Sequence, residues 1–239
     1  MSGCTAPPWQ SRLVSADASG TDSGDGASRA PVISPDGRLV AFQSDADDLG
    51  PRDTNGVSDL YVRDLAAGTT SLLTVNAAGT DAGNGPSTNV TFGRDGRRVL
   101  FASRSTDLAL PATSGQVMDL YLRDLATGST RLVSVDAAGS GGGDGNTTAG
   151  ELSPVGDRVL FVSDAHDLTT PAGTTTAIFE RDMATGVTTK LADGTNAAYA
   201  PSGDAVALVR SDGSVVLRDT ATGAITSVSA GLPGTATGR

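Results

Sequence analysis

The chain has few of the residues that form disulfides, bind transition metals or cross membranes. It contains one cysteine, Cys4, and one histidine, His166, among 239 residues. One cysteine excludes an internal disulfide, and a zinc site needs more histidine or cysteine than this chain has. The longest apolar runs, such as 159–162, are too short to span a bilayer.

Aromatic residues are also scarce, at 4% of the chain, whereas glycine is abundant, with 31 residues. This composition favours thin sheets joined by tight turns over a large helical core. The net charge is −10, so nucleic acid is not expected as a partner, because its phosphates would be repelled. A cationic protein, a cationic small ligand or a divalent cation is compatible with this charge.

Two blocks of sequence recur together along most of the chain. The copies of the first, which begins as Ser-Pro-Asp-Gly-Arg, are 34–42, 93–101, 153–161 and 201–208. The copies of the second, which begins as Asp-Leu-Tyr-Val-Arg-Asp, are 59–64, 119–124, 178–182 and 215–219. Long repeats built from short strands predict the blades of a β-propeller.

We therefore expect an all-β fold, a β-propeller of four four-stranded antiparallel blades within residues 11–230. The expected blades cover about 31–75, 90–135, 150–192 and 196–229. The sequence leaves open whether these blades close a ring or form part of a longer, incomplete propeller. Residues 1–10 are expected to be a disordered leader and 231–239 a flexible tail.

An extra strand is expected at the start of the propeller. Residues 11–17 match 130–136, a fourth strand of the second unit. The fourth unit has its own candidate for that strand, 224–229, so one fourth strand is left over. The extra strand would belong to a longer propeller, pack outside the ring, or self-associate with another chain through an exposed sheet edge.

Short and long connections alternate within each unit. Tight turns such as 64–69 join the third strand to the fourth, and we expect Gly68, Gly128, Gly186 and Gly223 to take positive φ there. Connections rich in glycine and aspartate, such as 45–58, join the second strand to the third. In an antiparallel meander these long loops gather on one face, which is where we expect binding.

The order of the two blocks resembles the WD-like repeat of TolB-type β-propellers, above all a secreted bacterial branch with long repeats. The matching residues are 34–42 and 59–68, and the likeness spans 11 to about 229. The resemblance implies an extracytoplasmic, non-catalytic propeller that acts as a binding platform or scaffold. Related propellers precede serine peptidase domains, so the alternative is the propeller of a peptidase or glycosidase system whose catalytic part is absent.

Cys4 follows the small residues Ser2 and Gly3, as at the end of a bacterial lipoprotein signal, although the apolar stretch of such a signal is missing here. On this interpretation the chain is lipid-anchored through Cys4. The alternatives are a periplasmic or secreted protein with an incidental cysteine in its leader.

No catalytic residues are expected, so the chain is not interpreted as an enzyme. His166 takes the position of Asp47 and Thr106 in the other units, so the fold does not require an imidazole there. The sequence has no Gly-x-Ser-x-Gly motif for an activated serine. Glu151 is the only acidic residue in an inner-strand run, which does not support paired glycosidase carboxylates at that level.

The first long loop is the best candidate for a metal site, and calcium is the only cofactor expected. The candidate ligands are Asp47, Asp48, Asp53, Asn55 and Asp59. Calcium prefers several carboxylate and carbonyl oxygens from a flexible loop. In the alternative, Asn55 and Gly56 form a turn and Asp59 bonds the backbone.

Aspartates recur throughout the expected long-loop face. Asp48, Asp107 and Asp167 each precede a leucine, and we expect them to bond loop amides. The acidic rim as a whole should attract a cationic partner. Its residues are Asp22, Asp25, Asp45, Asp47, Asp48, Asp53, Asp81, Asp107, Asp144, Asp164 and Asp167.

Overall fold

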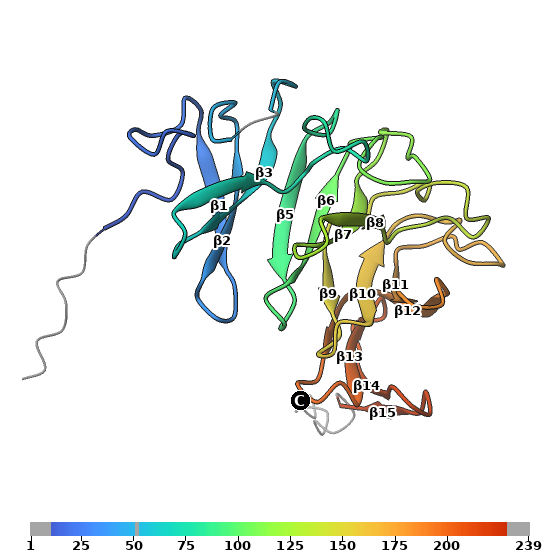
Figure 1. Ribbon diagram of the computed structural model, residues 1–239. Helices are drawn as coiled ribbons and strands as arrows, with labels where there is room; N and C mark the ends of the chain where they lie inside the picture. The colour runs from blue at the N-terminus through green and yellow to red at the C-terminus, as the bar shows by residue number, and fades with distance from the viewer. Residues whose placement is uncertain (1–10, 51–52, 229–239) are drawn as a thin grey trace, which may run out of the picture.

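A computed structural model describes residues 11–50 and 53–228 and shows an all-β protein of fifteen strands in three antiparallel sheets. Figure 1 shows the blades following one another from the N-terminal blade in blue to the C-terminal blade in red. The expected all-β propeller is confirmed. The sheets of the described residues do not close into a ring, as expected of an open or incomplete propeller. The expected leader, Cys4 and the expected tail lie outside these residues.

Blades 1 and 2 are separate four-stranded sheets whose strand order follows the sequence. The strands of blade 1 are β1 (Ser28–Ile33), β2 (Leu39–Ser44), β3 (Asp59–Asp64) and β4 (Thr69–Leu72). Those of blade 2 are β5 (Ser87–Phe92), β6 (Arg98–Ser103), β7 (Asp119–Asp124) and β8 (Ser129–Leu132). The inner strands β1 and β5 are each bulged, at residues Ala30 and Asn89, whose φ angles are 51° and 55°.

Blades 3 and 4 form one seven-stranded sheet because they share a strand. The strands are β9 (Gly150–Leu152), β10 (Arg158–Ser163), β11 (Ala177–Asp182), β12 (Thr188–Tyr199), β13 (Ala205–Arg210), β14 (Val215–Asp219) and β15 (Ile225–Ser227). The first half of β12 pairs with β11 as far as Asp193, and the second half pairs with β13 from Gly194 onward. The chain thus passes from blade 3 to blade 4 without a loop.

The segment expected to be an extra strand, 11–17, is instead irregular. Only Ala16 forms an isolated β-bridge, with Ser23. The matching residues of the second unit begin in β8, which pairs with β7. Among residues 11–50 and 53–228, by contrast, no strand pairs with 11–17 in this way. The segment packs on blade 1: Val14 joins the cluster around Phe42, and Arg12 donates a 2.7 Å hydrogen bond to the Leu65 carbonyl.

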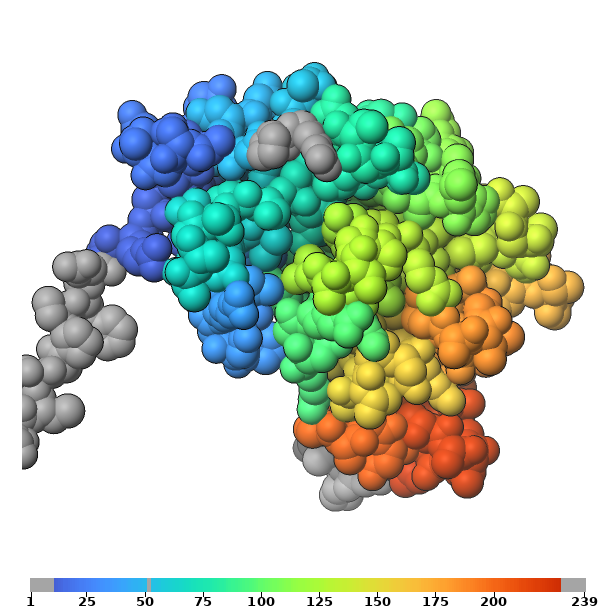
Figure 2. Space-filling model, in the orientation of Figure 1, coloured from blue at the N-terminus to red at the C-terminus, as the bar shows by residue number. Residues whose placement is uncertain are grey.

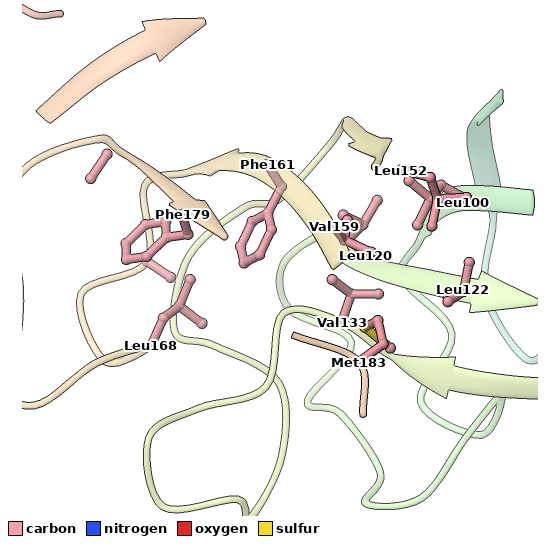
Figure 3. Close-up of a cluster of buried hydrophobic side chains, with 12 residues drawn as sticks. Leu100, Leu120, Leu122, Val133, Leu152, Val159, Phe161, Leu168, Phe179 and Met183 are labelled. Carbon is pink, nitrogen blue, oxygen red and sulfur yellow. The ribbon is translucent and has the colours of Figure 1, made fainter. Parts of the chain in front are cut away.

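Each blade has two faces, and the blades stack front to back. The front faces carry Phe42, Phe101, Phe161 and Leu208, and the back faces carry Ala41, Leu100, Leu160 and Ala207. Figure 3 shows Leu100, Leu120 and Leu122 from the back of blade 2 beside Val159 and Phe161 from the front of blade 3. The blades are therefore held together chiefly by burying apolar side chains between sheets.

The front aromatic residues stack within each of the first three blades. The ring centroids of Phe101 and Tyr121 are 5.6 Å apart, and those of Phe42 and Tyr61 are 6.0 Å apart. Blade 1 has no blade before it, yet Phe42 and Tyr61 are fully buried because Val14 and neighbouring loop residues lie against them. The N-terminal segment therefore covers the first front face.

The expected turn chemistry is confirmed. Gly68, Gly128, Gly186 and Gly223 all have φ between 70° and 74°, which residues with a side chain rarely adopt. The aspartate that opens each turn accepts the next amides; Asp64 Oδ1, for example, accepts those of Ala66 and Ala67 at 2.9 Å. Nowhere in 11–50 and 53–228 is there a helix that could span a membrane.

Candidate binding surface

The long loops of blades 1 to 3 lie at the opposite end of the blades from the tight turns. In Figure 1 these loops are at the top for blades 1 and 2, and the β1–β2 and β5–β6 turns point downward. We call this end the long-loop face. It is built from exit loops, 17–27, 76–86 and 136–146, and crossing loops, 45–58, 104–118 and 164–176.

Each exit loop is tied to a crossing loop by a repeated aspartate. The Oδ1 atoms of Asp48, Asp107 and Asp167 accept the amides of Asp25, Asn84 and Asp144, each at 3.0 Å. The main-chain carbonyls of the same three aspartates accept the amides of Ala18, Ala77 and Ala137. The expected role of these aspartates is confirmed, so these three carboxylates hold the loop layer together.

Glycine is required where an exit loop crosses the next loop. A Cβ atom at Gly26 would clash with the backbone of Asp45 and Ala46, and one at Gly145 would clash with that of Ala165. Residues with a side chain cannot fit there without moving the backbone. The Gly-x-Gly pattern of the exit loops therefore sets how closely the loops pack.

The candidate calcium loop is held by hydrogen bonds among its own residues. Asp59 accepts one from Thr74 Oγ1 at 2.5 Å and another from Asn55 Nδ2 at 2.7 Å. Asp53 Oδ2 accepts the hydroxyl proton of Tyr61, while the buried Asp53 Oδ1 has no hydrogen-bond partner. These contacts favour the turn and capping interpretation for Asn55 and Asp59.

The five candidate ligands are not all brought together. Asp47 lies close enough for its charge to raise the pKa of Asp53 and Asp59, whereas Asp48 is bound to the exit loop. Burial is the main cause that raises the pKa of Asp59, to about 7, and it also raises the pKa of Asp53. Within 11–50 and 53–228, no three acidic, histidine or cysteine side chains are grouped closely enough to hold one ion. Calcium binding stays a prediction.

Two adjoining cavities open beside the loops of blades 2 and 3. One, of about 580 Å³, lies on the long-loop face and is lined by Asp144, Asp164 and His166 among others. The second, of about 720 Å³, lies between blades 3 and 4 and includes Glu151 of β9 in its lining. Both include Asp164, Asn146 and Thr176, so together they form one acidic groove.

The sequence did not predict this groove, although it predicted that Asp144 and Asp164 belong to the acidic rim. Its inner half exists because β12 joins blades 3 and 4 directly, so no exit loop fills the space between them. The only sequence signal for it is the missing Gly-x-Gly loop between 192 and 196. In the groove, His166 Nδ1 lies 3.9 Å from Asp144 Oδ2, and Glu151 Oε2 accepts the Tyr199 amide at 3.0 Å.

Charge is segregated between the two ends of the blades. Arginines gather at the tight-turn end, where several pair with turn aspartates, as Arg38 does with Asp64 at 2.7 Å. The arginines of this end are Arg12, Arg38, Arg63, Arg94, Arg97, Arg98, Arg123, Arg131, Arg158, Arg181 and Arg218. The long-loop face carries most of the uncompensated carboxylates, including the exposed Asp22, Asp25, Asp47, Asp144 and Asp164.

No protein-family model and no curated protein matches this chain by sequence. Solved structures do match its fold. A TolB from Agrobacterium tumefaciens is 22% identical with a TM-score of 0.51, over 82% of this chain and 62% of that one. The fold is that of a TolB-like β-propeller.

Two further matches are the β-propeller domain of a protease and, separately, a lyase. The β-propeller domain of the Trilobed protease from Pyrococcus furiosus, described as having an open velcro topology, is 13% identical with a TM-score of 0.51, over 85% of this chain and 57% of that one. An oligogalacturonate lyase in complex with manganese is 15% identical with a TM-score of 0.52, over 84% and 52%. The chain spans between about half and three-fifths of the three matched structures.

Proposed function

We propose that this propeller is a non-catalytic binding module that holds a cationic protein or ligand on its long-loop face, outside the cytoplasm. The observation that carries the proposal is the groove around Asp164. It combines a concave shape with several carboxylates at the end of the molecule where carboxylates are in excess. Concave sites with a few polar groups are where proteins usually bind ligands.

The groove suits a lysine or arginine side chain. Asp144 and Asp164 are both exposed, so a partner's cation can pair with them at little desolvation cost. Hydrogen bonds such as that from the Asp144 amide to Asp167 Oδ1 hold the loops in place before a partner binds. This order lowers the conformational entropy that is lost on binding. The surrounding negative potential raises the rate of encounter with a cation.

The alternative is the propeller of a hydrolase system whose catalytic part lies elsewhere. The matched structures include a TolB, a protease and a lyase, so likeness of fold supports both interpretations. The residues of the groove favour binding: its histidine faces Asp144, and no serine is placed as a nucleophile by any hydrogen bond to that histidine among the described contacts.

An extracytoplasmic location and lipid attachment through Cys4 belong to the same proposal. They are supported by the resemblance of the repeats to secreted TolB-type propellers and by the small residues before Cys4. Calcium would add rigidity to the first loop, and its support is the orphaned Asp53 Oδ1 beside the charge of Asp47. Labelling with a radioactive fatty acid, with Cys4→Ser as control, tests the attachment.

The binding proposal is tested by calorimetry with a lysine hexapeptide as the probe. Replacing Asp144 and Asp164 by asparagine keeps their hydrogen-bond acceptors but removes charge, so each change should weaken binding about two- to fivefold. Asp204→Asn at the tight-turn end should leave the affinity unchanged. Higher salt should weaken the wild-type interaction. Equal affinities for Asp164→Asn and Asp204→Asn, or crosslinking of the peptide mainly to the tight turns, would refute the proposal.

A further inference from the structure

The arginine of the third strand recurs in blades 1 to 3 and forms the same contact in each of them. Arg63, Arg123 and Arg181 each donate a hydrogen bond from Nη1 to the threonine opposite them on the fourth strand, at 2.7–2.8 Å. Among residues 11–50 and 53–228, none of these three arginines forms an ion pair with a carboxylate. The threonine therefore holds each guanidinium in place without neutralising its charge.

Arg123 lines a cavity between blades 1 and 2, at the tight-turn end of the blades. The cavity has a volume of about 650 Å³, which suits a small organic molecule. Leu73 and Leu125 form part of its wall and also belong to the apolar packing between the two blades. Figure 2 shows the β1–β2 turn in light blue and the β5–β6 turn in green next to each other at the lower end of the molecule, where Gly96 lies close to Pro35.

Two further arginines reach the same cavity from the turns. Arg38 donates Nε and Nη2 to Asp64, and Arg97 donates the same two groups to Asp124. Among the contacts of the described residues, none uses Nη1 of either arginine. The remaining acidic residue of the lining, Asp36, is exposed and accepts the Arg38 amide at 3.0 Å. The acidic groups of the cavity are thus engaged, and Arg123 is left without a counter-ion.

The environment of Arg123 differs from that of the two turn arginines. Arg123 is half-buried, and burial lowers the pKa of its guanidinium, with no described carboxylate close enough to oppose this effect. Hydrogen bonds to aspartate instead raise the pKa of Arg38 and Arg97. Taking a guanidinium out of water costs free energy unless an anion pairs with it. An anion that entered the cavity would offset this cost.

We propose that this cavity binds a small organic monocarboxylate, with the carboxylate on Arg123 and the apolar body against Leu73 and Leu125. A guanidinium presents parallel N–H groups that match the two oxygens of a carboxylate. One guanidinium without a counter-ion balances one negative charge, which favours a carboxylate over the more highly charged phosphate group. The site goes beyond the proposed function, because it lies at the other end of the blades from the acidic groove and selects the opposite charge.

A ligand-observed NMR titration of the whole chain with 2-naphthoate tests the site. The wild type should bind this probe with a dissociation constant of about 1 mM or tighter. The neutral 2-naphthamide has the same shape but no charge for Arg123, so it should bind at least about tenfold more weakly. Inorganic phosphate should also bind at least about tenfold more weakly, because it has no apolar body to bury.

Substitutions locate the site. Arg123→Met keeps the apolar stem of the side chain and removes its charge, so it should weaken binding of 2-naphthoate about tenfold or more. Arg181→Met is the matched control: it removes the same threonine contact in blade 3, and it should bind the probe as the wild type does. Arg97→Gln, at an exposed position in the lining, should weaken binding about two- to fivefold and serves as a second test should Arg123→Met not fold.

Four results would overturn the proposal. The first is a wild-type dissociation constant for 2-naphthoate above about 10 mM. The second is an equal affinity for 2-naphthoate and either 2-naphthamide or inorganic phosphate. The third is wild-type affinity in Arg123→Met, or in Arg97→Gln where Arg123→Met does not fold. The fourth is a loss of affinity in Arg181→Met as large as that in the variants of the cavity.

Discussion

Asp107 Oδ1 accepts the backbone amide of Asn84 at 3.0 Å and so joins the exit loop of blade 1 to the crossing loop of blade 2. Asp107→Ala should lower the free energy of unfolding by about 1–2 kcal/mol, because it leaves that amide without its acceptor. Urea denaturation measures the change. Asp47→Ala, which removes an exposed carboxylate of the same face, is the control and should change stability by less than about 0.5 kcal/mol. If Asp107→Ala and Asp47→Ala lowered the free energy of unfolding equally, the hydrogen bond between Asn84 and Asp107 would not be a stabilising contact.

Gly128 has a φ of 70° in the turn between β7 and β8. Gly128→Val should lower the free energy of unfolding by about 1 kcal/mol or more, because a β-branched residue is strained at positive φ. Thr127→Val, at the neighbouring exposed position, controls for the added apolar surface. An unchanged melting temperature for Gly128→Val would contradict the hairpin geometry.

The buried Asp59 should make stability fall as pH rises. Burial raises the pKa of Asp59 from 3.8 to about 7, so the folded chain binds this proton more tightly than the unfolded chain does. The free energy of unfolding should therefore decrease between pH 4 and pH 7, by about 1 kcal/mol or more from this group. Asp119, whose pKa burial raises to about 6, adds to the trend.

Asp59→Asn should flatten this decrease when denaturation is measured at pH 5 and pH 7.5. Asp36→Asn should not, because hydrogen bonding from Ser34 lowers the pKa of Asp36 and places its titration below that range. A wild type that becomes more stable from pH 5 to pH 7.5, with the same slope in Asp59→Asn, would contradict the assignment.

Calcium gives a separate test of the first long loop. If the loop binds it, millimolar calcium should raise the melting temperature, because a ligand that binds only the folded state stabilises that state. Asp53→Ala or Asp59→Ala should abolish the rise, and Asp107→Ala should not. The absence of both a thermal shift and a calorimetric signal with calcium would leave only the turn interpretation.

The blades and tight turns were predictable because their signals are local. A Ser-Pro-Asp-Gly or Asp-x-x-x-Gly segment fixes a turn by its own side chains, and the flanking β-branched and aromatic residues define the strands. The ties made by Asp48, Asp107 and Asp167 were predictable because the repeat presents the same residue three times.

Features that depend on partners distant in sequence were missed. Residues 11–17 have the composition of a strand, but in the part of the chain that the structure describes no neighbouring strand pairs with them. The positive φ of Ala30 follows from a bulge in the pairing of β1 with β2. An alanine in the sequence gives no signal of such a bulge. The groove around Asp164 depends on how two blades meet, so residue type alone could not reveal it.

Because β12 belongs to two blades, it also determines how the blades unfold locally. Blades 1 and 2 touch mainly through side chains, so each can in principle loosen while its neighbour stays folded. Blades 3 and 4 share one hydrogen-bonded ladder, in which Asp193 pairs with Ala177 and the adjacent Gly194 pairs with Arg210. Fraying of blade 4 therefore also disturbs β12, the strand that completes blade 3. Among the blades, blades 3 and 4 are thus more strongly coupled to each other than blades 1 and 2 are. Hydrogen exchange should then show the amides of β11 and β13 opening together, as one cooperative unit.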